Sequence, residues 1–408
     1  MPGQITAVLE VGTSKVRCLV GEVLRDESVT VLAVAEVESR GIRKGEMLNR
    51  DEALLAVRDV LKETEVHYRK QIHSVILVLS GGDTTIRTSH GELRLADPYD
   101  NQPQEVDQTD VQEVVSVAKK FVLSDERIRL HSLPCYYSVD DIQRVISPVG
   151  MSCERLRAHL LTIHGRRSVV ENMQKLVSDV PVQCDDAVYS GLGAALAVTN
   201  KKMREAGVLV IDLGGGTTDF LLYYEGILRA GGTLRVGGDH ITNDIAAGLQ
   251  ISIDQAERIK IKEGNALTNA IERDRTLSIP SDSKGFNSKM VRALTLHTII
   301  QVRLEEIFEW VKDEIEKQSP NILLGSGVLL TGGGSFLNGA RDLGQKVFNL
   351  PCSYGKPIEV HGLPSKQQSP YYASMLGAIR YIDSLEQQAD TTTQWQRLLK
   401  KIWGHIDG

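Results

Sequence analysis

Apolar runs of strand length and amphipathic stretches of helical length follow one another along most of the chain. Residues 5–23 and 208–220 share one order: an apolar run, a carboxylate, a turn of Gly with Thr or Ser, and further strand-like residues. This order predicts a buried strand, a tight turn and a second strand. Because the order recurs about half a chain apart, we expect a duplicated fold with two related lobes.

Helical periodicity predicts several helices. Ser168 and Glu171 form a capping-box pattern at the start of one of them. A long amphipathic helix is predicted over residues 291–317. Residues 191–199 are small and apolar, which predicts a helix that allows the two lobes to approach closely. Residues 276–289 are polar and lack a period, so we expect a loop there.

Residues 83–164 have a different character. Strand-like runs at 130–140 and 156–163 accompany a helix that the pattern predicts from about 110 to 122. The segment has no glycine-rich turn and no pair of carboxylates placed to act on a nucleophile. We therefore interpret it as an inserted subdomain that carries interactions.

The stretch VLVIDLGGGTTDF, residues 208–220, has the chemistry of a phosphate-binding turn. Its three glycines leave backbone N–H groups uncovered and tolerate φ values that aim successive amides at one anion. The threonine hydroxyls add donors, and the carboxylate of Asp212 could hold a metal ion that balances phosphate charge. A glycine-rich hairpin that binds nothing is the alternative.

Three further features suit the same ligand. Lys15 in the first turn could reach a phosphate as a point charge, or could be an exposed hairpin lysine. Gly238 would present bare amides at the N-terminus of a helix capped by Asp239, a second place for an anion. A third glycine turn at 332–335 lies between a predicted strand and helix. It suits a base or ribose because only backbone can approach so closely; a plain tight turn is the alternative.

Composition narrows the classes of function. A chain of 408 residues with 41% apolar and 25% charged residues suggests a soluble protein of two or more domains. The net charge of −6 argues against nucleic-acid binding. Five scattered cysteines without a C-x-x-C pair predict reduced thiols in a cytosol. No signal-peptide pattern or run of apolar residues long enough to cross a membrane is present, which still allows a place on a membrane surface.

The last segment, residues 394–406, has the pattern of a helix that lies in a membrane surface. Its apolar positions share one helical face, whereas Arg397, Lys400 and Lys401 lie off that face. The face consists of Trp395, Leu398, Leu399, Ile402, Trp403 and Ile406. Tryptophan favours the lipid headgroup layer. A helix packed on the protein's own body or on a partner is the alternative. One copy should bind a membrane modestly, so firm attachment would need several linked copies.

The motifs LEVGTSK, VIDLGGGTTDF, GGD, AERIK and LLTGGGS occur in this order, which resembles the superfamily of actin, chaperone and sugar-kinase ATPases. The P-loop pattern G-x-x-x-x-G-K-[ST] is not present. The resemblance implies two lobes that close on ATP and Mg²⁺, with Glu10 and Asp212 at the metal, directly or through water. The binding residues that it implies are Glu10, Gly12, Thr13, Ser14, Lys15, Asp212, Gly214, Gly215, Gly216, Thr217, Thr218, Gly237, Gly238, Glu257, Lys260, Gly332, Gly333, Gly334 and Ser335.

Within that superfamily the chain is similar to the FtsA family of bacterial cell-division proteins over nearly its whole length. The stretches SRGIRKGEMLN, ISPVGMSCERLRAHLLTIHG and PYYASMLGAIRY carry this resemblance. It implies an α/β, actin-like two-lobed fold with duplicated ribonuclease-H-like cores, an α+β subdomain inserted in the first lobe, and a C-terminal amphipathic helix. The implied boundaries are subdomain IA at 1–82 and 165–200, IC at 83–164, IIA at 201–248 and 318–384, IIB at 249–317, a linker at 385–393 and the membrane helix at 394–406.

The family resemblance implies a scaffold that binds ATP, polymerises, tethers the tubulin-like FtsZ to the inner membrane at the division septum and recruits later division proteins. The FtsZ C-terminal tail is expected on subdomain IIB, where Arg303 matches a position used in the family; a solvated arginine is the alternative. A metabolite kinase of the same fold would need an acidic base beside a substrate pocket. A PilM-like pilus-assembly adaptor is the other alternative, and that family usually lacks the terminal helix.

Two positions depart from the superfamily pattern. Glu10 stands where these ATPases usually have Asp, which would shift the metal by about one methylene. Val188 and Tyr189 stand where relatives that hydrolyse ATP readily carry a glutamate before a proline. Without a carboxylate to orient the attacking water, we expect tight ATP binding with slow or negligible turnover, and we assign no catalytic residue.

Overall fold

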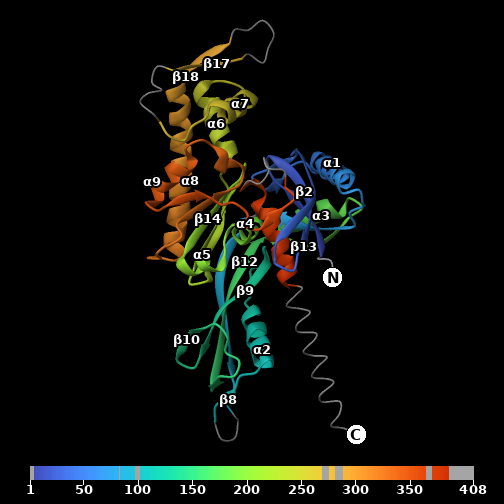
Figure 1. The fold of residues 1–408 in the computed structure, drawn as a ribbon, viewed down its shortest axis with the longest axis vertical. Helices are drawn as coiled ribbons and strands as arrows, with labels where there is room; N and C mark the ends of the chain where they lie inside the picture. Colours follow the sequence, from blue (N-terminus) through green and yellow to red (C-terminus); the bar gives the residue numbers. More distant parts are fainter. Residues whose placement is uncertain are drawn as a thin grey trace.

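The protein has two lobes and an elongated inserted subdomain. The computed structural model describes residues 4–81, 83–96, 102–268, 275–280, 288–363 and 370–385. Figure 1 shows the lobe with α1 and α3 beside the lobe with α6, α8 and α9, and the subdomain with α2 extending below them.

The first lobe is built on a six-stranded sheet in the order β13-β6-β1-β2-β3-β21. Its first three strands form an antiparallel meander, whereas β6 runs parallel to β1 and β13 runs parallel to β6. Helices α1 (Arg50–Tyr68) and α3 (Arg167–Ser178) pack on this sheet. The strands are β1 (Ile5–Val11), β2 (Lys15–Val23), β3 (Val29–Glu38), β6 (Ser74–Leu79), β13 (Gln183–Tyr189) and β21 (Val360–His361), with a small hairpin of β4 (Ile42–Arg43) and β5 (Glu46–Met47).

The second lobe repeats this topology in the order β16-β15-β14-β19-β20. Two antiparallel pairings again join the first three strands, and two parallel pairings join the rest. This repeat confirms the duplicated fold that the sequence pattern predicts. The elements are β14 (Val208–Leu213), β15 (Thr218–Tyr224), β16 (Ile227–Leu234), α6 (Gly238–Leu249), α7 (Ile253–Glu263), α8 (Ala293–Gln318), β19 (Val328–Thr331), α9 (Ala340–Phe348) and β20 (Cys352–Tyr354).

The inserted subdomain extends the second lobe's sheet rather than the first lobe's. A single bridge between Gly232 and Thr85 joins β16 to β7, so that β7, β12, β9 and β10 continue the sheet. A separate apolar core lies between these strands and α2. The elements are β7 (Thr85–Arg94), β8 (Gln104–Glu105), α2 (Gln108–Lys119), β9 (Arg127–Val139), β10 (Ile142–Val145), β11 (Ser152–Cys153) and β12 (Arg155–Arg166).

Two local predictions are wrong. Ser168 does not cap α3, because β12 runs directly into the helix and places Ser168 inside its first turn. The region expected to be a loop contains a hairpin of β17 (Thr276–Ile279) and β18 (Lys289–Arg292). Its strands have only four residues each, too short for alternation to stand out in sequence, yet Leu277 and Ile279 join the second lobe's core.

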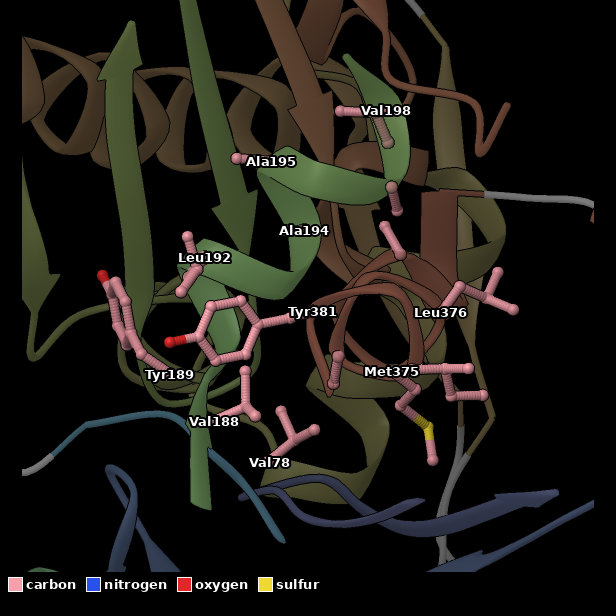
Figure 2. Packing of buried hydrophobic residues seen from close by; sticks show 14 of the residues in the cluster. Val78, Val188, Tyr189, Leu192, Ala194, Ala195, Val198, Met375, Leu376 and Tyr381 are labelled. Carbon is pink, nitrogen blue, oxygen red and sulfur yellow. The ribbon is translucent and has the colours of Figure 1, made fainter. Parts of the chain in front are cut away.

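A pair of crossed helices packs at the centre of the molecule. Helix α4 (Ser190–Val198) contacts strands of both lobes and packs against the last described helix, residues 373–385. Figure 2 shows Leu192, Ala194, Ala195 and Val198 of α4 beside Met375, Leu376 and Tyr381 of the last helix. This arrangement confirms that the small residues of 191–199 allow a close approach. The short helix α5 (Lys201–Ala206) follows α4.

Candidate functional site

A cavity of about 270 Å³ lies between the two lobes, where the β1–β2 turn faces the β14–β15 turn. It brings together most of the residues that the sequence singles out. These are Glu10, Gly12, Thr13, Ser14, Lys15, Asp212, Gly214, Gly215, Gly216, Thr217, Gly238, Glu257, Lys260, Gly332, Gly333 and Gly334. Three predicted residues do not line the cavity but support the segments that form its walls: Thr218, Gly237 and Ser335. The hydroxyls of Thr218 and Ser335 donate to the carbonyls of Val236 and Gly332, each at 2.7 Å.

The first turn is closed by its own backbone. The Gly12 N–H donates to the carbonyl of Lys15 at 3.0 Å, and a Cβ at Gly12 would lie 2.9 Å from that oxygen. The Thr13 hydroxyl accepts the N–H of Gly45 at 3.1 Å, so the β4–β5 hairpin is held against the turn. The turn therefore presents its remaining donors to the cavity in a fixed arrangement.

The second turn is locked to the start of α6. The N–H groups of Gly238 and Asp239 donate to the carbonyls of Gly214 and Gly215 at 2.9 and 2.8 Å. The expectation that Gly238 offers a bare amide to an anion is therefore wrong, because that amide is used inside the lobe. The helix also begins one residue before Asp239, with Gly237 as its N-cap. Gly238 lines the cavity as a small residue rather than as a donor.

A cluster of carboxylates and one arginine forms the floor of the cavity. Glu10 is buried and ion-paired with Arg17, which faces it across the β1–β2 register. The Ser374 hydroxyl donates to the other Glu10 oxygen at 3.1 Å. Burial, then the neighbouring charges of Asp219 and Glu10, raise the pKa of Asp212 to about 8. Asp212 therefore holds a proton at neutral pH in this arrangement.

Asp219 is a floor residue that the sequence prediction missed. It is buried and accepts hydrogen bonds from the hydroxyls of Ser80, Ser190 and Thr233. Burial raises its pKa, while these hydroxyls oppose the rise. It lies opposite Asp212 in the β14–β15 register. Its place at the end of the glycine motif is the sequence feature from which it could have been predicted as a site residue. Arg17 and Ser80 were missed because each stands alone in sequence.

The rim on the second lobe combines a basic group with exposed apolar side chains. Lys260 on α7 contacts the Glu257 carboxylate at 2.6 Å and donates to the carbonyl of Gly238 at 3.1 Å. Ile261 is 72% exposed and Phe336 is 52% exposed, and both line the cavity. Exposed apolar surface beside hydrogen-bonding groups suits a planar ring that stacks at the mouth. Phe336 directly follows the third glycine turn, and this position is the sequence feature from which it could have been predicted as a site residue.

Mg²⁺ does not fit the predicted pair of ligands as these side chains lie. The Oε1 atom of Glu10 accepts from Ser374, and its Oε2 atom is ion-paired with the Arg17 guanidinium, although no described group donates a hydrogen bond to it. Among the residues that the structure describes, no group of three or more His, Cys, Asp or Glu side chains could hold a metal ion. Glu10 therefore serves as the partner of Arg17, and no step below depends on a metal.

The position of the expected catalytic glutamate is filled by core residues. Val188 and Tyr189 are both buried, and the Tyr189 hydroxyl donates to the carbonyl of Gly232 at 2.6 Å. Neither residue lines the cavity. The prediction of slow turnover stays a prediction.

Two further predictions concern places away from the cavity. Arg303, on α8, is held by Asp244 and Glu306, each at 2.5 Å. The apolar face of residues 394–406 lies outside the described residues. Within the ranges given above, no helix has the length and apolar character that crossing a membrane requires.

Replacing Asp212 by asparagine should increase stability more at alkaline than at acid pH. The folded carboxyl, with its pKa of about 8 against the ordinary 3.8, keeps a proton that the unfolded chain releases between these values. The free energy of unfolding therefore falls as pH rises through this window, and asparagine avoids that loss. Because the cavity screens part of the effect, we expect the gain at about pH 8 to exceed that at about pH 5 by roughly 2 kcal/mol.

Thermal melts at the two pH values check this expectation. Asp141→Asn, which removes an exposed carboxylate from the turn after β9, is the matched control. An equal gain at both pH values for Asp212→Asn would contradict the assigned protonation.

Comparisons with known proteins agree with the fold and the motifs. A family model described as "Cell division protein FtsA" matches residues 209–377, and one described as "SHS2 domain inserted in FTSA" matches residues 81–164. The cell division protein FtsA of Pseudomonas aeruginosa is 30% identical over 388 residues, which cover 95% of this chain and 91% of that protein. FtsA of Escherichia coli is 32% identical over 382 residues, covering 91% and 89%.

Solved structures share the fold at low identity. A chain of the PilM-PilN type IV pilus biogenesis complex has a TM-score of 0.62 at 16% identity and covers 91% of this chain and 96% of its own length. MreB5 of Spiroplasma citri bound to ADP has a TM-score of 0.55 at 13% identity and covers 95% and 98%. These likenesses show an actin-like fold, here with an SHS2 insertion, and do not favour a PilM-like role. On the identity shared along nearly the full length of both curated relatives, the chain belongs to the FtsA family of cell division proteins.

Proposed function

We propose that this chain is an ATP-binding scaffold that polymerises and tethers FtsZ filaments to the inner membrane at the division septum. The observation that carries the proposal is the cavity in which three glycine turns from two lobes meet, in a member of the FtsA family. MreB5 of Spiroplasma citri, which shares the fold, is found with ADP and with AMPPNP. In this chain the two turns around Gly12 and Gly215 would hold phosphates, and α7 with the turn at 332–335 would hold adenosine.

Bound ATP would act as a clamp on the two lobes. The phosphate turns belong to different lobes, so a nucleotide that contacts both favours one angle between them. Val188 and Tyr189 supply no carboxylate to the cavity, which supports slow or negligible hydrolysis. Nucleotide binding, more than turnover, would then set whether the lobes have the angle needed for assembly into a filament.

The remaining surfaces would connect this filament to its partners. Subdomain IIB, residues 249–317, would bind the FtsZ C-terminal tail, and a partner that uses Arg303 would exchange its pairs with Asp244 and Glu306. Subdomain IC, residues 83–164, would contact later division proteins, whereas IA, IIA and helix α7 of IIB would hold the nucleotide. The basic amphipathic segment 394–406 would attach each copy to the cytoplasmic face of the inner membrane after a linker at 385–393.

Removal of the terminal segment should abolish membrane attachment. We expect the full chain with ATP to pellet with anionic vesicles and a chain ending at Thr393 to stay in the supernatant, with at least a tenfold lower bound fraction. Leu399→Glu, which places a charge on the apolar face, should act like the truncation, because burying that charge in the headgroup layer is costly.

Gln396→Glu adds the same charge off the apolar face and is the matched control. The membrane role fails if the truncated chain and the full chain pellet equally. It also fails if the two glutamate variants bind alike, because attraction by the basic residues alone would then explain the binding.

A further inference from the structure

Arg17 is fixed at the floor of the cavity on three sides. Its guanidinium pairs with Glu10, donates to the carbonyl oxygen of Tyr371 and lies over the Tyr371 ring at 4.2 Å from the centroid. The side chain is only 12% exposed and the residue lines the cavity. A planar guanidinium that is stacked and paired in this way loses little further freedom when it binds an anion.

Arg17 also retains an unused donor. Within the part of the chain that the structure describes, its Nε–H group is buried and has no hydrogen-bond acceptor. A buried donor without a partner is unfavourable unless a ligand or water supplies an acceptor. A phosphate oxygen in the cavity is such an acceptor, and guanidinium groups bind phosphate through several N–H groups at once.

The other two cations of the cavity are engaged differently. Lys15 is 40% exposed, lies 3.9 Å from Glu36 and is therefore screened by solvent. Lys260 is paired with Glu257 on the second lobe. Lys260 is as enclosed as Arg17, at 13% against 12% exposed, but it belongs to α7 of the second lobe. Arg17 is therefore the enclosed cation that the first lobe supplies to the cavity.

The same arrangement disfavours a divalent ion beside Glu10. The Oε1 atom of Glu10 accepts from the Ser374 hydroxyl, whereas its Oε2 atom lies against the Arg17 guanidinium without a hydrogen bond from any described group. A guanidinium next to that carboxylate would also repel a second cation.

We propose that Arg17 is a built-in counter-charge for the nucleotide phosphates, so that this chain binds ADP and ATP without Mg²⁺. The inference rests on the proposed nucleotide binding and deepens it. Arg17 takes the role of neutralising phosphate charge that a metal ion has in other nucleotide sites. The β1–β2 register, which sets Arg17 opposite Glu10, makes this charge part of the first lobe itself.

The test measures ADP affinity of the full chain by calorimetry, with Mg²⁺ and with a chelator. We expect chelation to weaken binding to the unmodified chain by about threefold or less. In Arg17→Met, binding without Mg²⁺ should weaken by at least about tenfold, and Mg²⁺ should restore part of it because Glu10 is then unpaired. Arg17→Lys, which keeps the charge without the planar group, should fall between the two.

Arg229→Met is the matched control, because this half-buried arginine pairs with Glu225 outside the cavity. Circular dichroism shows whether each variant is folded, and Arg17→Lys keeps the test open if Arg17→Met is not. A loss of binding on chelation as large in the unmodified chain as in Arg17→Met overturns the inference alone. Absence of binding in both conditions overturns the proposed nucleotide site and the inference together.

Discussion

Gly377→Ala should lower the free energy of unfolding by roughly 3 kcal/mol or more. A Cβ at this position would lie 1.7 Å from the carbonyl oxygen of Gly193. A Cβ at Gly193, on the facing helix, would likewise lie 2.1 Å from the carbonyl oxygen of Ser374. The atoms that would be struck belong to backbone in two packed helices, so a helix must move. Figure 2 shows α4 packed against the last helix.

The measurement is a denaturant or thermal melt of the full chain. Gly232→Ala is the matched control, since its nearest neighbour, the carbonyl of Thr84, would be 3.4 Å from the added carbon. If Gly377→Ala melts together with the unmodified chain and with Gly232→Ala, the helices are not in the contact described.

The consequence of such a shift would extend to the site. Ser374, one turn before Gly377, donates to Glu10, and Tyr371 holds the guanidinium of Arg17. The packing of α4 against the last helix therefore positions Ser374 and Tyr371, which contact Glu10 and Arg17 at the floor of the cavity. We expect Gly377→Ala to weaken nucleotide binding even under conditions in which the variant remains folded.

The sequence predicts the parts of this fold that local patterns encode. Apolar runs with a carboxylate and a glycine turn at Glu10 and Asp212 mark the two related sheets, and small residues mark α4. The β17–β18 hairpin could not be predicted, because four-residue strands give too few positions for alternation. The predicted N-cap at Ser168 is wrong because a capping pattern does not reveal that a strand continues into the helix without a break.

In the site, the glycine turns can be predicted from the sequence, whereas contacts between residues far apart in the chain cannot. Arg17 looks like an ordinary outward strand residue until Tyr371 and Ser374, about 350 positions later, are placed beside Glu10. Hydrogen bonds between separate turns cannot be predicted from the sequence either. Gly238 has the sequence of an anion site, yet Gly214 and Gly215 occupy its helix N-terminus.

Gly216 is the point at which the second lobe's turn contacts the first lobe. A Cβ there would lie 2.4 Å from the hydroxyl of Thr13 and 2.8 Å from the Cα of Lys44. Both atoms belong to the first lobe, and both are closer than the Ser14 atoms that a Cβ at Gly215 would meet, the nearest of them at 3.2 Å. An added methyl group must therefore separate the lobes at the phosphate end.

Gly216→Ala should weaken ADP and ATP binding by roughly 10- to 100-fold, because an overpacking cost of about 1–3 kcal/mol must be met whenever the lobes close. Unfolding should change little, since the open lobes can avoid the contact. Gly238→Ala is the control in the same cavity: its nearest neighbours would be 3.6 Å away, so its affinity should change by about twofold or less. Calorimetric titration of both variants decides the matter. Equal affinities would mean that nucleotide binding does not require the lobes to meet at Gly216, and the clamp between them would have to lie elsewhere.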